Sequence, residues 1–180
     1  MIAAPEDVLA FWREAGPDKW FTKDAAFDDA IRSRFLATYE AAAAGQLAAW
    51  EATADGALAL TIVLDQFPRN MFRGDARSHA ADALALAVAD RALARGFDRG
   101  MPVSNQQFFY LPFEHSESLR DQERCCALFA ATSDADLLKW AHIHADIIRR
   151  FGRFPHRNAL LGRTTTADEQ AFLDAGGFNG

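Results

Sequence analysis

Cysteine is scarce in this sequence, and its placement excludes two common ways of stabilising or using a small protein. Only Cys125 and Cys126 occur among the 180 residues, and they are neighbours. Adjacent cysteines in a helical stretch are poorly placed to form a disulfide with each other, and they lack the spacing of a pair of metal ligands. We therefore expect two reduced thiols in a cytoplasmic protein, not a disulfide framework or a cysteine-bound metal.

Long hydrophobic runs and an excess of positive charge are also missing. No stretch reaches the roughly 18 consecutive apolar residues that indicate a membrane-spanning helix. The first segment, MIAAPEDVLAFWREAG, has no basic region of the kind that opens a signal peptide. The formal net charge is −6, which disfavours non-specific binding to nucleic acid or to an anionic membrane. We expect neither a membrane nor a nucleic acid as a partner.

Helix-forming residues, by contrast, are abundant. Hydrophobic residues make up 50% of the chain, and alanine, which has the highest intrinsic helix propensity, is frequent. Apolar residues recur every three or four positions, and no segment shows the alternation of a strand. The pattern predicts one all-α domain over residues 1–180, an antiparallel array of about seven to nine helices. The expected helices cover residues 5–15, 24–44, 56–67, 75–95, 104–112, 121–131, 134–151 and a last stretch beginning near 166.

Two similar polar motifs follow predicted core helices. They are LDQFPRNMFRG at residues 64–74 and FGRFPHRNALLG at residues 151–162. In each, a phenylalanine precedes a proline, and the residue before a proline is disfavoured in the helical conformation. We therefore expect a helix to end at Phe67, and the chain to turn sharply again at Phe154.

The polar side chains of these motifs admit two interpretations. In the structural one, they donate hydrogen bonds to the carbonyls left unpaired at the helix ends. In the functional one, both motifs face one cavity, where the guanidinium groups bind a carboxylate or phosphate. The candidate ligand-binding residues are Arg69, Asn70, Arg73, Arg153, Arg157 and Asn158.

Several titratable residues are candidates for proton transfer. They are His144, His156, Glu117, His115 and Asp65. His144 falls on the apolar face of the helix over residues 134–151, so it is either a core histidine or part of a pocket. Asp65 precedes Arg69 by four residues and is expected to pair with it.

The acidic residues after residue 112 also admit two interpretations. If the helix continues, Glu114, Glu117 and Asp121 share one face. There they either act as general acids or bases, or simply pair with arginines or face solvent. A metal set of Asp65, His115, Glu117 and His144 lacks any familiar ligand spacing, so we predict no metal and no cofactor.

Five segments together resemble the bacterial family labelled domain of unknown function 924. They read LAFWREAGPDKWF, FDDAIRSRF, IVLDQFPRNMFRG, FFYLPFEHSESLRDQE and HADIIRRFGRFPHRNALLGR, and they cover nearly the whole chain. That family is placed among tetratricopeptide-like folds, so the resemblance implies an α-α superhelix. It implies no activity. The repeat signature of tetratricopeptide proteins itself is not legible in the sequence.

Three hypotheses for function follow. The first is a pocket between helices that binds a small anionic molecule, with a reaction on that molecule as an extension. The second is a tetratricopeptide-like module that binds a partner protein, with the arginine and histidine motifs purely structural. In the third, the motifs pair with each other and leave no cavity. No nucleophile stands out, so neither a reaction nor an oligomeric state is predicted.

Overall fold

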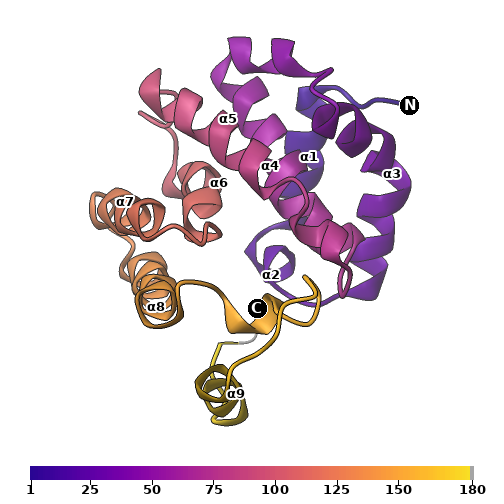
Figure 1. Ribbon diagram of the computed structural model, residues 1–180. Coiled ribbons are helices and arrows are strands. Elements are labelled where there is room, and N and C mark those ends of the chain that lie inside the picture. Colours follow the sequence, from indigo (N-terminus) through magenta and orange to yellow (C-terminus); the bar gives the residue numbers. More distant parts are fainter. Residues whose placement is uncertain (179–180) are drawn as a thin grey trace. The chain divides into compact units, whose positions relative to one another are not determined.

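The computed structural model describes residues 1–178, and in that range every regular element is a helix (Figure 1). The predicted all-helical array is confirmed, whereas a tetratricopeptide-like repeat stays a prediction. No helix within the described range is both long and apolar enough to span a membrane. The α-helices are α1 (Pro5–Ala15), α2 (Pro17–Trp20), α3 (Ala25–Ala43), α4 (Ala54–Met71), α5 (Asp82–Ala94), α6 (Val103–Glu114), α7 (Leu119–Ala130), α8 (Ala135–Phe151) and α9 (Ala167–Asp174). The short 3-10 helices are η1 (Ala48–Ala52), η2 (Ala76–His79) and η3 (Pro155–Arg157).

The chain forms two compact units, residues 1–112 and residues 113–180. The first contains α1 to α5 and most of α6. The second begins with the last two residues of α6 and contains α7 to α9. The expectation of a single domain over residues 1–180 stays a prediction.

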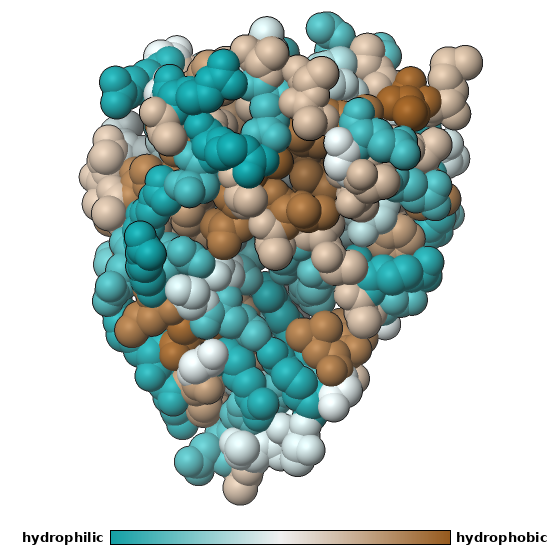
Figure 2. Space-filling view, turned by 45° about the horizontal axis from the view of Figure 1, so that its top comes forward, coloured by the Kyte–Doolittle hydropathy of each residue, from teal (hydrophilic) through white to brown (hydrophobic). Residues whose placement is uncertain are grey.

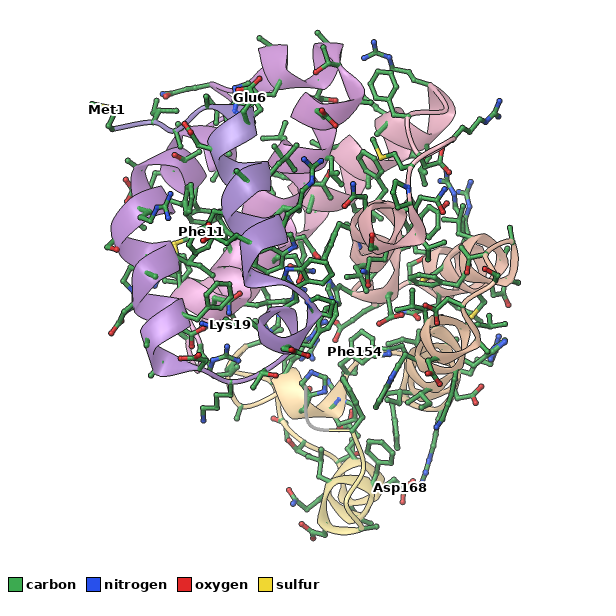
Figure 3. The ribbon with its side chains drawn as sticks, turned by 180° about the vertical axis from the view of Figure 1, so that it is seen from behind. Met1, Glu6, Phe11, Lys19, Phe154 and Asp168 are labelled. Atoms are coloured by element: carbon green, nitrogen blue, oxygen red, sulfur yellow. The ribbon has the colours of Figure 1, made fainter. Side chains whose placement is uncertain are left out.

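Helix α4 is the centre of the first unit. Every residue from Gly56 to Pro68 is buried, as its apolar sequence predicts. It packs against α1, α3 and α5, which form layers around it in Figure 1. Aromatic rings fill the space between these helices. Phe11, labelled in Figure 3, stacks on Phe27 with ring centroids 5.5 Å apart, and Phe67 lies 4.9 Å from Phe35.

Proline does not end α4, contrary to the sequence-based expectation. The helix continues through Pro68 to Met71, and the N–H of Phe72 donates to the Pro68 carbonyl over 2.9 Å. A proline inside a helix removes one backbone hydrogen bond and crowds the preceding turn. Phe67 is fully buried next to Trp12, with ring centroids 5.6 Å apart, and this burial outweighs the local preference of a residue before proline.

Helix α6 departs from expectation at both ends. It begins at Val103, one residue before the expected start, and it continues through Pro112 to Glu114. Buried aromatic residues of α6 again compensate for the proline. The helix expected over residues 75–95 is interrupted at residues 80–81, between η2 and α5. The Asp75 side chain caps the start of η2 by accepting the N–H of Arg77.

In the second unit, α7 and α8 lie side by side (Figure 1). Helix α8 ends as the sequence predicts, with Gly152 in the left-handed conformation at φ 69° and Phe154 extended at φ −88°. Ile147, Ile148 and Phe154 form the buried cluster of this unit. Residues from α9 and the following tail pack against that cluster.

Candidate functional site

The polar residues of the first motif bind carboxylates from the same unit. Asp28 on α3 accepts hydrogen bonds from Arg73 at 2.8 and 3.0 Å and from the Asn70 amide at 2.7 Å. Burial opposes ionisation of Asp28, but the bonds from Arg73 and Asn70 outweigh it, so its pKa lies below the usual value. Asp28 therefore remains charged at neutral pH as the counter-ion of this corner. Sequence reasoning missed it because it lies 45 positions from Arg73 in the chain.

The expected pair of Asp65 and Arg69 is confirmed. One Arg69 nitrogen lies 3.3 Å from an Asp65 carboxylate oxygen, and Asp65 is fully buried. Arg69 also makes two hydrogen bonds, at 3.0 and 3.1 Å, to Asp82 on α5. Burial favours the neutral form of Arg69, but these two carboxylates outweigh it and raise its pKa. The guanidinium is thus held between two acids.

Two arginine side chains donate hydrogen bonds to backbone carbonyls near the end of α4. The Arg32 side chain on α3 donates to the Met71 carbonyl, with its Nε at 3.0 Å. The structural interpretation assigned this role to Arg69 and Asn70. Arg69 fills it in part, since its guanidinium donates to the Asp65 carbonyl of the same helix. Otherwise the Arg69 guanidinium and the Asn70 amide bind carboxylates, which form stronger hydrogen bonds than neutral carbonyls do.

In the second motif, Arg153 binds Glu169 on α9. Two hydrogen bonds of 2.6 and 2.8 Å join them, and Arg153 also donates to the Thr164 carbonyl at 2.8 Å. The Asn158 amide donates to Glu169 at 3.2 Å. The bonds from Arg153 chiefly lower the pKa of Glu169, to about 2. The sequence did offer a signal for Glu169, since it follows Thr166 at the spacing of a capping box, which the structure contains.

Glu117, in the loop between α6 and α7, binds the segment that follows α8. It binds Arg163 through hydrogen bonds of 2.6 and 3.0 Å and accepts the Phe154 N–H at 2.8 Å. Burial opposes its ionisation, but Arg163 and that N–H outweigh it and lower the pKa of Glu117. Arg157 donates to the His115 carbonyl at 2.9 Å and lies 4.4 Å from the centre of the Phe154 ring. Glu117 and Arg157 therefore fix the turn that follows α8.

Glu114, Glu117 and Asp121 do not share a helix face, so that expectation was wrong. Helix α6 ends at Glu114, and α7 begins only after Glu117. Gln122, which is fully buried, donates to the carbonyls of Glu114 and Ser116 at 2.6 and 2.7 Å. These bonds supply the donors that the end of α6 needs, and they turn the chain between the acids.

His144 lies on the buried face of α8, as its position in the helical pattern predicts. It is 6% exposed, and its Nδ1 lies 2.9 Å from the Trp140 carbonyl and 3.4 Å from a Glu114 carboxylate oxygen. Because a carbonyl only accepts, Nδ1 carries a hydrogen. In the neutral ring the lone pair is then on Nε2. The acid beside His144 is Glu114, and neither Glu117 nor Asp65, the two acids among the proton-transfer candidates.

The structure brings His144 and His156 to the same pair of phenylalanine rings. Each imidazole lies 5.6 Å from Phe154, which is labelled in Figure 3. Phe178, beyond α9, lies 4.5 Å from His144 and 5.3 Å from His156. His115, the remaining candidate, contributes its carbonyl to Arg157.

An apolar cleft lies next to these rings, between α8 and α9. Its volume is about 280 Å³. The Arg150 guanidinium lies at its side, 4.6 Å from the Phe151 ring centre and 5.7 Å from that of Phe172. Sequence reasoning did not predict this cleft, because one wall comes from the chain after α9. The α8–α9 cleft is lined by Ile143, Asp146, Ile147, Arg150, Phe151, Phe172 and Phe178.

Among residues 1–178, no three His, Cys, Asp or Glu side chains are grouped so that they could hold a metal ion. The assignment of the arginines, asparagines, histidines and acids above to a ligand or catalytic site stays a prediction. What the structure adds is the internal partner of each motif arginine and the position of two imidazoles beside an apolar cleft.

These features define an all-helical protein in which arginines bind buried carboxylates at the chain reversals. The chain belongs to the family described as "Bacterial protein of unknown function (DUF924)", which matches residues 8–177, so the resemblance seen in the sequence is confirmed. A solved structure, that of the protein of unknown function ATU0120 from Agrobacterium tumefaciens, is 47% identical with a TM-score of 0.92. The match covers 95% of this chain and 97% of that one. No curated protein matches.

Proposed function

We propose that the chain binds a small molecule with an apolar body and an anionic group in the α8–α9 cleft. The single observation behind this proposal is an exposed guanidinium, Arg150, beside a cleft with otherwise mostly apolar walls. Ligand sites commonly combine an apolar surface with a few polar groups that fix the orientation of the ligand. The sequence also suggested an anionic small molecule as the ligand, but it placed the binding site at the arginines of the two motifs and not at Arg150.

The lack of a carboxylate counter-ion among residues 1–178 distinguishes Arg150 from Arg69, Arg73 and Arg153. A ligand at Arg69, Arg73 or Arg153 would have to compete with a carboxylate of the chain itself. Within residues 1–178, Arg150 contacts aromatic rings and has no carboxylate at ion-pairing distance, because the neighbouring Asp146 binds Arg149 at 2.7 Å. A ligand carboxylate can therefore bind Arg150 through two parallel hydrogen bonds.

The size of the cleft limits the ligand. A volume of about 280 Å³ lies at the small end of the range for ligand sites, about 300–1,000 Å³, and so favours a ligand with on the order of ten non-hydrogen atoms. The three phenylalanine rings favour an aromatic or branched aliphatic body. Phenylacetate, benzoate and 4-methylpentanoate are suitable probes.

To test this, the protein is titrated with each of the three carboxylates up to about 10 mM, and binding is monitored through the NMR shifts of the α8 amides. We expect binding by at least one carboxylate and little by phenylacetamide, which lacks the charge. Arg150→Ala should weaken binding about tenfold, the equivalent of about 1.4 kcal/mol. The matched control is Arg34→Ala, because the exposed Arg34 also lies over aromatic rings, 4.7 Å from Phe11 and 5.3 Å from Phe35. Absence of binding by all three probes, or equal binding of phenylacetamide, would contradict the proposal.

The alternative is a tetratricopeptide-like module that binds a partner protein. The ion pairs of the motif arginines support the structural part of this alternative. Exposed large hydrophobic residues are spread over several elements, among them Phe21, Leu84 and Trp140. In the face drawn in Figure 2, hydrophobic residues lie between hydrophilic ones. Scattered exposed apolar residues are normal on a protein surface. A negative titration together with a stable partner complex in a pull-down would favour this alternative.

A cytoplasmic location is part of the same proposal. Its support is the pair of thiols in α7, Cys125 and Cys126, which are both buried. Burial raises the pKa of each thiol, so both stay protonated and slow to oxidise.

A further inference from the structure

The face of α8 that lines the cleft carries an apolar row beside a charged row. Ile143 and Ile147 are four residues apart, and so are Asp146 and Arg150. All four residues line the α8–α9 cleft. Side chains four positions apart on a helix lie one above the other, with Cβ atoms about 5–6 Å apart. A ligand in the cleft therefore meets an apolar surface and, next to it, one carboxylate and one guanidinium.

The two charged residues of this face do not pair with each other. Asp146 accepts a hydrogen bond from Arg149 at its Oδ1 over 2.7 Å, whereas Arg150 lies over the rings of Phe151 and Phe172. Within the described residues, no ion pair joins Asp146 to Arg150, and Oδ2 of Asp146 accepts no hydrogen bond. A negative and a positive group of the cleft wall are therefore both open to a ligand.

The ion pair between Asp146 and Arg149 leaves room for a ligand cation. The side chains are 72% and 43% exposed, respectively, and ion pairs that are this open to water add little to stability. A carboxylate can accept about four hydrogen bonds, of which Arg149 uses one. An ammonium group can therefore bind Asp146 without displacing Arg149.

We propose that the ligand of the α8–α9 cleft is a small α-amino acid with an apolar side chain. Its carboxylate binds Arg150, its ammonium binds Asp146, and its side chain lies against the phenylalanine rings of the cleft. The two charged groups of an α-amino acid are attached to one carbon atom, so their binding partners must be close neighbours, as residues four apart on a helix are. This inference rests on the proposed function and adds the ammonium group to the ligand.

The charge of Asp146 favours an amino acid over a simple carboxylate. A carboxylate held at Arg150 brings a second negative charge close to Asp146, and like charges repel each other. An ammonium on the same ligand adds an attraction that offsets this repulsion. A simple amine meets the opposite difficulty, because its positive charge lies close to Arg150. A ligand that carries both charges is thus the best match to this wall.

L-Leucine and 4-methylpentanoate test the proposal directly, because they differ only in the amino group. Each is titrated into the protein at neutral pH, and binding is monitored through the NMR shifts of the α8 amides. We expect leucine to bind at least about fivefold more tightly than 4-methylpentanoate, since the ammonium gains a charged hydrogen bond. 3-Methylbutylamine, which is leucine without its carboxylate, should bind about tenfold more weakly than leucine.

Asp146→Asn removes the negative charge and keeps the shape of the side chain. We expect the preference for leucine over 4-methylpentanoate to fall to about twofold or less, while the affinity for 4-methylpentanoate does not fall. A damaged cleft would weaken the binding of both compounds. The matched control is Asp29→Asn, because Asp29 on α3 is also exposed, at 75%, and binds an arginine three residues further on, Arg32, at 2.8 Å. It should leave the preference unchanged.

The outcomes separate this inference from the proposed function. If 4-methylpentanoate binds and leucine binds no more tightly, the amino-acid assignment is overturned and the proposed function stands. A preference for leucine that persists in Asp146→Asn also overturns the assignment. If neither compound binds, both proposals are overturned. Equal affinities for 3-methylbutylamine and leucine overturn the proposed function, because the carboxylate then contributes nothing.

Discussion

Arg153 and Glu169 are joined by two hydrogen bonds of 2.6 and 2.8 Å, although they come from opposite ends of the segment that follows α8. The same carboxylate accepts the N–H of Thr166 at 2.7 Å and so completes the cap of α9. One side chain therefore fixes both the turn of the second motif and the start of the last helix. Loss of the negative charge on Glu169 should therefore destabilise both the turn and the start of α9.

Stability at low pH should depend on Glu169. Its pKa in the folded protein is about 2, below the ordinary 4.5, mainly because Arg153 binds the ionised form. The stabilisation from this lowered pKa is fully present above about pH 4.5 and is lost as the pH falls toward 2. We expect Glu169→Gln to lower the melting temperature at pH 7 and the difference from the native protein to shrink between pH 4.5 and 2. Thermal unfolding monitored by circular dichroism across this range measures it.

The control for that experiment is Glu123→Gln, since Glu123 is an exposed residue of α7. Its melting curve should follow the native one at every pH. A constant difference between Glu169→Gln and the native protein down to pH 2 would refute the assigned linkage.

Replacement of Arg157 should be costly. The side chain is 6% exposed, donates to the His115 carbonyl and lies over the Phe154 ring. Arg157→Ala removes a charged hydrogen bond and buried packing, so we expect a loss of about 2–4 kcal/mol in the free energy of unfolding. Arg157→Lys keeps the charge but not the planar stacking and should lose less. Urea unfolding of the three proteins gives these values, and a loss below about 1 kcal/mol in Arg157→Ala would be incompatible with a structural role.

Gly56 should tolerate no side chain. A Cβ at this position would lie 2.1 Å from the Trp50 carbonyl oxygen and 2.9 Å from the Thr53 hydroxyl oxygen. Gly56→Ala must therefore push η1 away from the start of α4, at a cost of about 1–3 kcal/mol or more. The neighbouring Asp55→Ala, at an exposed position, should cost less than about 1 kcal/mol. Equal free energies of unfolding for the two variants in urea would show that η1 can shift away from α4 at no cost, contrary to this prediction.

The two thiols should react slowly in the folded protein. Cys125 is fully buried and Cys126 is 9% exposed, and burial raises the pKa of both thiols. Since the thiolate is the reactive form, we expect reaction with a disulfide reagent such as dithionitrobenzoate to be at least about tenfold slower in the native protein than in guanidinium chloride. Cys126→Ser would assign the faster of the two thiols. A native rate close to the unfolded one would contradict the burial of this face of α7.

The sequence predicted those helices whose ends carry strong local signals. The Asp24 cap of α3, the Gly152 termination of α8 and the Thr166 cap of α9 depend on nearby residues only. The prediction that α4 ends at Phe67 was wrong. It followed the local preference of a residue before proline, but the free energy gained by burying Phe67 in the helix is larger than that preference.

The candidate site was predicted in its residue types but not in its pairing. Helical periodicity placed His144 on the buried face, and it required no tertiary information. Its neighbour Glu114 depends on where α6 ends, and the cleft depends on the fold-back of the chain after α9. Nothing in the sequence indicates where the C-terminal GGFNG segment packs. Its Phe178 contacts His144, while residues 179–180 lie outside the described residues.

The bond from Arg32 to the Met71 carbonyl has a consequence for how the first unit opens. The last turn of α4 is closed locally by the Phe72 N–H, and a side chain of α3 additionally holds its Met71 carbonyl. Amide hydrogens in that turn should therefore exchange with solvent more slowly than those of a helix end without such a contact, and Arg32→Ala should speed their exchange.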